Sequence, residues 1–489
     1  MTTLAWFMVP AITILHSVAG GRYYPPGRGF KRAHVAVYYP DESELAFKMP
    51  SRIFRWRPYA AVTNSMREAE GKQPATPAHD VAVNHSTSLM IRIRGHYLPD
   101  LAAVTIADIE RIASAKLEPG VRWYYNSGAD QEETLKENKE AFKRLRFRPR
   151  VLVDVSRVST TTTLLGQSVS MPVGFSPSAM HQLAHPDGEI GTAKAAEAAG
   201  TVMILSSMST ISLEEIRRSA PNCILWLQTY LYKDRALTES LVKRAAAAGF
   251  SAIVLTVDSP VFGQKVMANK YRFHLPTHLR FGTLEGSLPT ATVKNHPDFD
   301  AFVDDLISPS IAWSDVAWLR NVSGLPVVMK GVLTPEAAMK CHQSGAAAII
   351  VSNHGGRQLD GTPASIDVLP EIVEAVGGRL EVYLDSGVRT GADVARALAL
   401  GARAAFIGRP VVWGLAYNGK SGVSRVLDIY RSELERTLRL LGCPDVTELT
   451  PELVVHRSHF ASPHHRPPFP AEGSRSGAPD WTTTASEPL

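Results

Sequence analysis

Apolar and polar positions follow a repeating pattern along the chain from residue 171 onwards. Short apolar runs end in polar or glycine residues, and alanine-rich segments of about a dozen residues with helical spacing lie between them. The apolar runs predict strands at 172–176, 202–206, 224–228, 252–256, 326–330, 347–352, 381–385 and 404–407. The intervening segments predict helices, among them 189–199, 237–248, 335–344 and 391–400.

This alternation predicts the fold class. Strand–helix units with short connections are typical of a parallel sheet covered by helices, and eight of them favour closure into a (β/α)8 TIM barrel. One connection, 258–325 after the fourth strand, is long. An insertion of that length at the carboxyl end of a strand is typical of a lid or a substrate loop. We therefore expect an α/β protein built on a TIM barrel.

The regions on either side of the barrel differ from it in pattern. The segment 105–110 has the pattern of a capped amphipathic helix, so an N-terminal helical segment should precede the barrel. Residues 1–97 show no sustained periodicity and predict an irregular, basic extension, and 462–489, rich in proline and serine, predict a disordered tail. The barrel domain should therefore span 98–461.

Residues 1–19 are the candidate signal segment. Their apolar run is too short to span a bilayer, and although Ser17 and Ala19 suit a cleavage site, no basic residue precedes the run. The chain has three cysteines without a CxxC pair: Cys223, Cys341 and Cys443. That usage excludes a disulfide scaffold and suits a reducing compartment. We expect an intracellular protein, cytoplasmic or organellar, with secretion as the less favoured alternative.

Charge is concentrated in the N-terminal extension. The net charge is +5, yet residues 22–97 hold twelve Lys or Arg against six Asp or Glu, so the remainder carries a net charge of minus one. Aromatic and basic residues are not interleaved as in a nucleic-acid module, so we expect no nucleic-acid partner. The histidines near the C-terminus lie in a proline-rich context that indicates a solvated tail, and we predict no metal site.

Polar residues follow every predicted strand, where active sites of such barrels form. These strand ends are 176–179, 206–208, 228–230, 256–258, 330–331, 352–357, 385–389 and 408–410. A single one reads as a capped turn or a solvated charge, but eight together indicate a site. Glycine and arginine recur at the last two, as Gly387-x-Arg389 and Gly408-Arg409, which in these barrels predicts a phosphate site and hence a phosphorylated substrate or cofactor.

Lys330 ends the fifth apolar run and would lie near the barrel axis, where a buried lysine must meet an anion or lose its charge. Three chemistries suit it: a Schiff base, a phosphate contact, or stabilisation of a reduced anionic flavin. Amide and hydroxyl groups at Ser206, Gln228 and Thr256 suit the heteroatom edge of a flat ring better than an aldolase pocket. The residues thus favour flavin mononucleotide (FMN), with a Schiff-base lyase as the alternative.

The sixth strand is followed by Ser352-Asn353-His354-Gly355-Gly356-Arg357-Gln358. Its histidine can act as a base near neutral pH, and its arginine can bind a carboxylate through two parallel hydrogen bonds. This segment resembles the active-site motif of the FMN-dependent 2-hydroxy-acid oxidising enzymes, which include glycolate oxidase and the flavin L-lactate dehydrogenases. The resemblance covers about 98–461 and extends to motifs at 124–130, 147–150, 232–235, 384–389 and 407–410.

The resemblance implies a role for each residue around the substrate. His354 would be the catalytic base, with carbanion and hydride routes both open, and Asp258 would pair with it. Arg357 would bind the substrate carboxylate, with Tyr124 and Tyr230 donating hydrogen bonds to the carboxylate and the hydroxyl group.

The same resemblance assigns the other strand-end residues to FMN. Lys330 would face N1 and O2 of the ring and stabilise the reduced anion. Ser206, Gln228 and Thr256 would contact the ring, the backbone of Pro177, Ser178 and Ala179 its N5 side, Asp385 the ribityl chain, and Gly387, Arg389, Gly408 and Arg409 the phosphate. Ser352 is also expected to bind the cofactor.

Two residues depart from the family pattern. Lys265 stands where a second carboxylate-binding arginine is usual, and because a lysine lacks the planar fork we expect weaker or shifted carboxylate affinity. Met208 stands where glycolate oxidases carry a bulky aromatic residue. Its narrower, flexible side chain predicts lactate or a longer acid as substrate rather than glycolate.

The sequence therefore predicts an FMN-dependent (S)-2-hydroxy-acid oxidase or L-lactate dehydrogenase. The electron acceptor would be oxygen or a separate partner, because residues 1–97 contain no heme-binding HPGG motif. The alternatives are the Schiff-base lyase using Lys330 and a flavin-binding protein with little catalysis. By resemblance we expect a homo-oligomer, a tetramer.

Overall fold

The computed structural model describes residues 92–93, 96–97, 103–271, 273–285 and 299–460. The chain divides into two units, 1–85 and 86–489, of which the first lies outside the described residues. The candidate signal segment, most of the extension 1–97 and the tail 462–489 also lie outside them, so the expected domain boundaries stay predictions. The short strands β1 (Arg92–Ile93) and β2 (His96–Tyr97) pair in antiparallel fashion.

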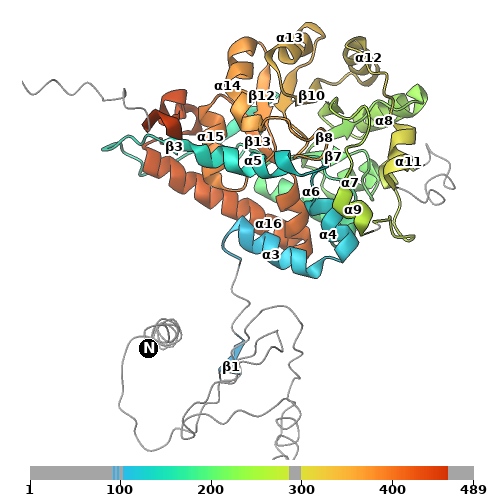
Figure 1. Ribbon diagram of the computed structural model, residues 1–489, viewed down its shortest axis with the longest axis horizontal. Helices are drawn as coiled ribbons and strands as arrows, with labels where there is room; N and C mark the ends of the chain where they lie inside the picture. Colours follow the sequence, from blue (N-terminus) through green and yellow to red (C-terminus); the bar gives the residue numbers. More distant parts are fainter. Residues whose placement is uncertain (1–91, 94–95, 98–102, 272, 286–298, 461–489) are drawn as a thin grey trace, which may run out of the picture. The chain divides into compact units, whose positions relative to one another are not determined.

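A closed barrel of eight parallel strands lies at the centre of the second unit (Figure 1). In chain order the strands are β6 (Val173–Phe175), β7 (Val202–Ser206), β8 (Ile224–Thr229), β9 (Ala252–Thr256), β10 (Val327–Val332), β11 (Ala348–Val351), β12 (Glu381–Leu384) and β13 (Ala404–Ile407). Each pairs with the next, and β13 closes the barrel on β6. The predicted TIM barrel is confirmed.

Apolar side chains fill the barrel interior, as the buried runs predicted. Trp226, Ile350, Tyr383 and Phe406 belong to one fully buried cluster that also includes Leu164. Leu164 comes from the hairpin of β4 (Thr162–Leu164) and β5 (Gln167–Val169), so this hairpin packs against the barrel core. Burial of each large apolar side chain contributes about 1.5–3 kcal/mol. The interior is thus a packed core.

A helix follows each barrel strand. These helices are α6 (Gly188–Ala199), α7 (Leu213–Ser219), α8 (Arg235–Ala247), α12 (Ser314–Ser323), α13 (Pro335–Gln343), α14 (Ser365–Val376), α15 (Gly391–Ala399) and α16 (Arg409–Leu441). The last of them is interrupted at Asn418 and Gly419, whose dihedral angles are not helical. Among the described residues, none of the helices has the length and apolar character that crossing a membrane requires.

Within the described part of the chain, three helices precede the barrel: α3 (Ile106–Lys116), α4 (Pro119–Asn126) and α5 (Glu133–Arg144). The predicted helix is α3, which begins with a capping box between Thr105 and Asp108 and lies alongside α16 (Figure 1). After α5, strand β3 (Leu145–Phe147) pairs with β14 (Val454–His456) near the end of the described chain.

The insertion after β9 contains α9 (Val266–Lys270), the 3-10 turn η2 (Gly282–Leu284) and α11 (Phe299–Leu306). Its first part packs on α4 through two stacked ring pairs. The ring centroids of Trp123 and Tyr271 lie 5.7 Å apart, and those of Tyr124 and Phe273 lie 4.3 Å apart. This segment, which the sequence presented as one unpatterned break, is therefore attached to an N-terminal helix.

Candidate active site

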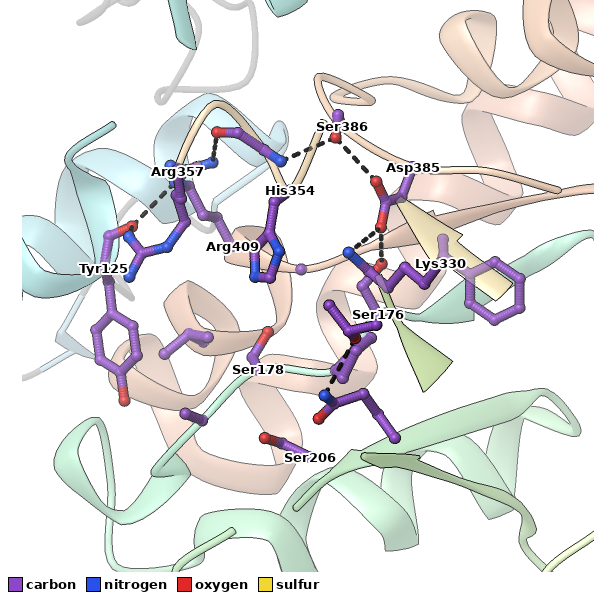
Figure 2. Close-up of a pocket in the computed structure, with 18 of the residues that line it drawn as sticks. Tyr125, Ser176, Ser178, Ser206, Lys330, His354, Arg357, Asp385, Ser386 and Arg409 are labelled. Atoms are coloured by element: carbon purple, nitrogen blue, oxygen red, sulfur yellow. Dashed lines mark hydrogen bonds and ion pairs between the residues drawn. The ribbon is translucent and has the colours of Figure 1, made fainter. Parts of the chain in front are cut away.

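A cavity of about 1050 Å³, its open mouth included, lies at the carboxyl ends of the barrel strands (Figure 2). Most of the predicted site residues line it: Tyr124, Pro177, Ser178, Ala179, Ser206, Met208, Gln228, Tyr230, Thr256, Lys265, Lys330, His354, Arg357, Asp385, Gly387, Arg389, Gly408 and Arg409. Asp258 and Ser352 lie directly behind this lining and contact His354. The structure therefore brings the predicted residues together at one place.

His354 lies just beyond β11 with φ of 58°, in the left-handed region that few residues other than glycine adopt. Its backbone N–H donates to Ser352 Oγ at 3.0 Å, which holds the main chain in this conformation. Its ring Nδ1 lies 2.9 Å from Asp258 Oδ1, and Ser259 Oγ donates to the same oxygen at 3.0 Å. One ring nitrogen is thus engaged by a carboxylate.

The charge state of this pair follows from its surroundings. Burial lowers the pKa of His354, and the nearby charge of Asp258 offsets this only in part. Burial alone would raise the pKa of Asp258, but the His354 interaction and the charge of Lys330 outweigh it and leave the pKa below its usual value. Near neutral pH the pair is therefore a neutral imidazole beside a carboxylate, in which Nε2 can accept a proton.

Lys330 is 3% exposed and ends the apolar part of β10. Its Nζ lies 3.1 Å from Ser352 Oγ. It also lies 3.4 Å from Asp385 Oδ2 (Figure 2). Asp385 Oδ2 also accepts a hydrogen bond of 3.0 Å from Ser176 Oγ. A carboxylate therefore balances the charge of the buried ammonium group. Lys330 nevertheless still lines the cavity.

A strip of amide and hydroxyl groups runs along the ends of β7, β8 and β9. Gln228 Nε2 donates to Thr256 Oγ1 at 3.1 Å, and Gln228 Oε1 accepts from the backbone of Ser207 at 3.3 Å. Ser206 Oγ accepts from the backbone N–H of Met208 at 3.1 Å. These bonds fix the orientation of amide and hydroxyl groups that also line the cavity. Donors and acceptors held in this way suit the edge of a heteroaromatic ring.

Three arginines meet at the opposite end of the cavity. Arg409 donates to the carbonyl oxygens of Tyr125, Ser127 and Gly355 at 2.9–3.0 Å. Burial, with the added charges of Arg357 and Arg389, lowers the pKa of Arg409 well below its usual value. A bound anion would stabilise the charged form of these arginines, so this end of the cavity favours binding of an anion.

Two further observations indicate that an anion belongs there. Across the described parts of the chain, Arg357, Arg389 and Arg409 form no ion pair with a carboxylate, and the buried Nε of Arg389 has no hydrogen-bond partner. An unused buried donor is costly unless a ligand accepts its bond. The donors of Arg389 and Arg409 suit a phosphate, the polar strip suits a flavin ring, and Lys330 lies between them, so the residues present fit FMN.

The substrate side of the cavity is formed by side chains outside the barrel strands. Lys265 is 2% exposed, with its Nζ 3.1 Å from the carbonyl of Gly263 and 4.6 Å from the ring centroid of Phe262. The Tyr124 ring stacks on Phe273 and also contacts the guanidinium of Arg357, whose Cζ is 5.2 Å from the ring centroid. Both cations that could bind a substrate carboxylate therefore lie beside aromatic rings.

Several site residues were missed from the sequence. Ser386 Oγ donates to Asp385 Oδ1 at 2.8 Å and accepts from the backbone of Gly355 at 2.9 Å, which links the sixth and seventh strand ends. Ser176 lay in a segment recognised as a strand end but received no role. Phe262 gave no signal, because it lies in the unpatterned insertion. Tyr125 lay in a recognised motif but received no role, and the structure shows it in contact through both its carbonyl oxygen and its hydroxyl group.

Comparison with known proteins agrees with this geometry. Residues 113–456 match the FMN-dependent dehydrogenase family. Glycolate oxidase 3 of Oryza sativa subsp. indica is 48% identical over 351 residues, covering 72% of this chain and 95% of that protein. The 2-hydroxyacid oxidase 1 of Homo sapiens is 46% identical over 355 residues, covering 72% and 96%.

The solved structures give the same result. The crystal structure of mandelate oxidase with (S)-4-hydroxymandelic acid superposes with a TM-score of 0.67 and 36% identity, covering 70% of this chain and 96% of that one. Another crystal structure of mandelate oxidase gives a TM-score of 0.65 at 37% identity, with the same coverage of both chains. This chain belongs to the FMN-dependent dehydrogenase family that oxidises 2-hydroxy acids, and its cofactor is FMN.

Proposed function

We propose that this protein oxidises L-2-hydroxy acids larger than glycolate, such as L-lactate, to the corresponding 2-oxo acids. One observation carries the proposal: a neutral His354 held by Asp258 faces the same cavity as Arg357 and Lys330. That arrangement combines a base, a carboxylate anchor and a buried cation in one space.

His354 takes a proton from the substrate, and Asp258 stabilises the imidazolium that results. FMN, when bound, would supply the acceptor for the two electrons and the second hydrogen that the 2-hydroxy acid loses as it becomes a 2-oxo acid. Burial, with the charge of Asp258, raises the pKa of Tyr230, so its hydroxyl group stays protonated and can donate a hydrogen bond to the substrate oxygen. The proposed catalytic residues are His354, Asp258, Tyr230 and Lys330.

Arg357 is the proposed main anchor of the substrate carboxylate. Its Nη1 donates to the carbonyl oxygens of Tyr124 at 2.6 Å and Ser127 at 3.1 Å, which fixes the guanidinium relative to α4. Tyr124 would add a hydrogen bond to the same carboxylate. Lys265 lines the cavity as well and would contribute charge without a planar fork.

The preference for acids larger than glycolate rests on Met208. This residue is buried and lines the cavity, and a methionine yields more readily than an aromatic ring to a longer 2-substituent. A panel of glycolate, L-lactate and longer L-2-hydroxy acids tests the proposal through kcat/KM. L-Lactate or a longer acid should be fastest, and a panel with glycolate fastest would contradict the preference.

Two alternatives are separated by simple experiments. A Schiff-base lyase would leave a borohydride-trapped adduct on Lys330, whereas the proposed oxidase leaves none. A flavin-binding protein with little catalysis is favoured only by Lys265 in place of arginine. In that case bound flavin would stay oxidised when L-lactate is added without oxygen.

The partners and location that we propose rest on smaller observations. Oxygen or a separate acceptor takes the electrons onward, and oxygen uptake with peroxide detection distinguishes them. Val151 and Leu152 are adjacent and 79% and 104% exposed, and such exposed apolar side chains support a contact surface within a homo-oligomer. We propose a tetramer, which light scattering tests. The three cysteines are free and buried, which supports an intracellular compartment, cytoplasmic or organellar.

A further inference from the structure

A buried carboxylate that does not line the cavity lies at the start of α6. Glu189 is in the first turn of α6 and is 1% exposed. The positive end of the helix dipole stabilises a negative charge at that position. The sequence identified Glu189 only as the start of a helix, and the reaction proposed above gives it no role.

Its carboxylate joins two loops that border the cavity. Oε1 accepts from the backbone N–H of His181 at 2.9 Å and from that of Thr210 at 2.9 Å. Oε2 accepts from Thr210 Oγ1 at 2.5 Å. His181 belongs to the loop after β6, which carries residues 177–179, and Thr210 belongs to the loop after β7. One side chain therefore holds both loops by their main chains.

The two loops also contact each other at the residue proposed to set substrate size. The backbone N–H of Met180 donates to the carbonyl of Met208 at 3.3 Å. Tyr125 on α4 donates through its hydroxyl to the carbonyl of Met180 at 2.9 Å. Met180 has φ of 62°, so its conformation depends on these surrounding contacts. The position of Met208 thus follows from the loops that Glu189 ties together.

The inserted segment encloses the loop after β7 from another direction. Thr283 Oγ1 donates to the carbonyl of Ile211 at 3.2 Å, and a Cβ on Gly282 would stand 2.7 Å from the backbone nitrogen of Ser212. The loop therefore has little space in which to shift while the carboxylate bonds remain. Loss of the Glu189 hydrogen bonds would allow the loop after β7 to move on the side that faces α6.

We propose that Glu189 is a positioning residue that sets the substrate-size selectivity of this enzyme by fixing Met208 at the cavity wall. The inference rests on the proposed function, because it concerns the same cavity. The carboxylate accepts three bonds from two loops, two of them from backbone N–H groups at Oε1. A glutamine removes the negative charge that strengthens all three bonds and places a donor where Oε2 accepts from Thr210.

The test compares Glu189→Gln with the parent protein in two backgrounds, the natural chain and Met208→Ala. The readout is the ratio of kcat/KM for L-lactate to that for glycolate. In the natural background the ratio should move toward one by about 5–10-fold. In the Met208→Ala background the same substitution should change it by less than about twofold, because the side chain it acts through is gone. An equal change in both backgrounds, or no change in either, would overturn the inference.

A second readout does not need turnover. Glyoxylate and pyruvate are titrated into the FMN-loaded proteins, and the change in flavin absorbance gives the ratio of their dissociation constants. The ratio should move toward one in Glu189→Gln. If the parent protein oxidises no 2-hydroxy acid, the proposed function is wrong, while this binding ratio still decides the inference about Glu189.

Two further variants separate positioning from a general loss of structure. Thr210→Val removes one of the three bonds, so it should shift the ratio in the same direction by a smaller factor even if Glu189→Gln does not fold. Asp315→Asn is the control at another buried carboxylate: Asp315 lies in the first turn of α12, accepts from the backbone of Ala312 at 2.7 Å and pairs with Arg235 at 2.7 Å. It should leave the ratio unchanged, and an equal shift there would overturn the inference.

Discussion

The cofactor side of the cavity is built from residues at the ends of barrel strands, whereas the substrate side combines loop residues after the strands with Tyr124 on α4 and Lys265 in the insertion after β9. Lys330 and Gln228 lie on β10 and β8 themselves, where hydrogen bonds between neighbouring strands fix the backbone. Tyr124 and Lys265 depend instead on how separate segments pack. The proposed cofactor contacts therefore rest on the barrel strands, whereas the proposed substrate contacts also depend on added segments and on Met208 in the loop after β7.

The two sides also differ in the strength of their contacts. A buried ion pair joins Lys330 to Asp385, and breaking such a pair typically costs about 3–5 kcal/mol. The substrate side is held by ring stacking and by cations over rings, each contributing about 0.5–2 kcal/mol. Substitutions on the cofactor side should therefore affect stability and FMN binding, and those on the substrate side should affect KM.

The largest effect is expected at His354, which lies between the two sides. His354→Ala should lower kcat by about 10²–10⁴-fold because the proton acceptor is lost, while FMN still binds. Turnover and flavin content measure these separately. His342→Ala on α13, away from the cavity, is the matched control and should keep full activity. If His354→Ala kept a kcat within threefold of the parent value, His354 would not be the catalytic base.

On the cofactor side, Lys330→Met should leave the carboxylate of Asp385 buried without its cation. We expect the free energy of unfolding to fall by about 3–5 kcal/mol and FMN affinity to weaken. Urea denaturation and flavin fluorescence report the two effects. Adding Asp385→Asn should restore part of the stability but not the FMN affinity. If Lys330→Met changed KM alone, the division between the two sides would be wrong.

On the substrate side, Arg357→Lys should raise KM by about 10–100-fold, since a charge-assisted hydrogen bond contributes about 1.5–3 kcal/mol and lysine lacks the planar fork. FMN affinity and thermal stability should change little, as measured by flavin fluorescence and a melting curve. Equal losses of FMN and of substrate affinity would show that Arg357 serves the cofactor side as well.

The pH profile should show one inflection on the acid side. His354 must be unprotonated to accept a proton, and burial lowers its pKa, so the active form predominates at pH 7 and log kcat/KM falls only as pH drops below 6.5 through the His354 pKa. The charge of Asp258 acts to raise that pKa. Asp258→Asn should therefore move the inflection to lower pH and reduce the plateau. An inflection that moved to higher pH would contradict this electrostatic role.

The smallest effect is expected for Lys265→Arg. The position is buried beside Phe262, and a planar guanidinium there could bind the carboxylate in two places. We expect a severalfold lower KM, a smaller change than that caused by Arg357→Lys. Steady-state kinetics on the same panel of 2-hydroxy acids gives both values. An unchanged KM for every acid would show that Lys265 does not contact the carboxylate.

The contrast between the two sides also explains what the sequence could predict. Lys330, His354 and Asp385 were identifiable because each follows an apolar strand, and strand ends of a barrel converge. Phe273 and Phe262 were not, because their contacts with α4 and with Lys265 arise from packing of segments distant in sequence and without periodicity. Local pattern specifies the barrel but carries no information on which loops meet above it.

For some of the predicted site residues, the structure gives a different reason for the residue type than the sequence suggested. Gly387 was expected at the phosphate site and does line the cavity. The structure adds that a Cβ there would stand 2.1 Å from the carbonyl oxygen of Asn138 on α5, at a φ of 85°. Close packing on an N-terminal helix therefore requires glycine independently of any ligand. Glu189 was likewise recognised only as part of a helix, because its partners are backbone groups of two loops.

The most direct test of the central claim is anaerobic mixing of the FMN-loaded protein with L-lactate while the absorbance of the bound flavin is followed. The account predicts loss of the oxidised-flavin absorbance with one pyruvate formed per flavin, no loss with D-lactate, and a flavin that stays oxidised in His354→Ala. A parent protein whose flavin stayed oxidised with every L-2-hydroxy acid, or a His354→Ala variant reduced at the parent rate, would contradict it.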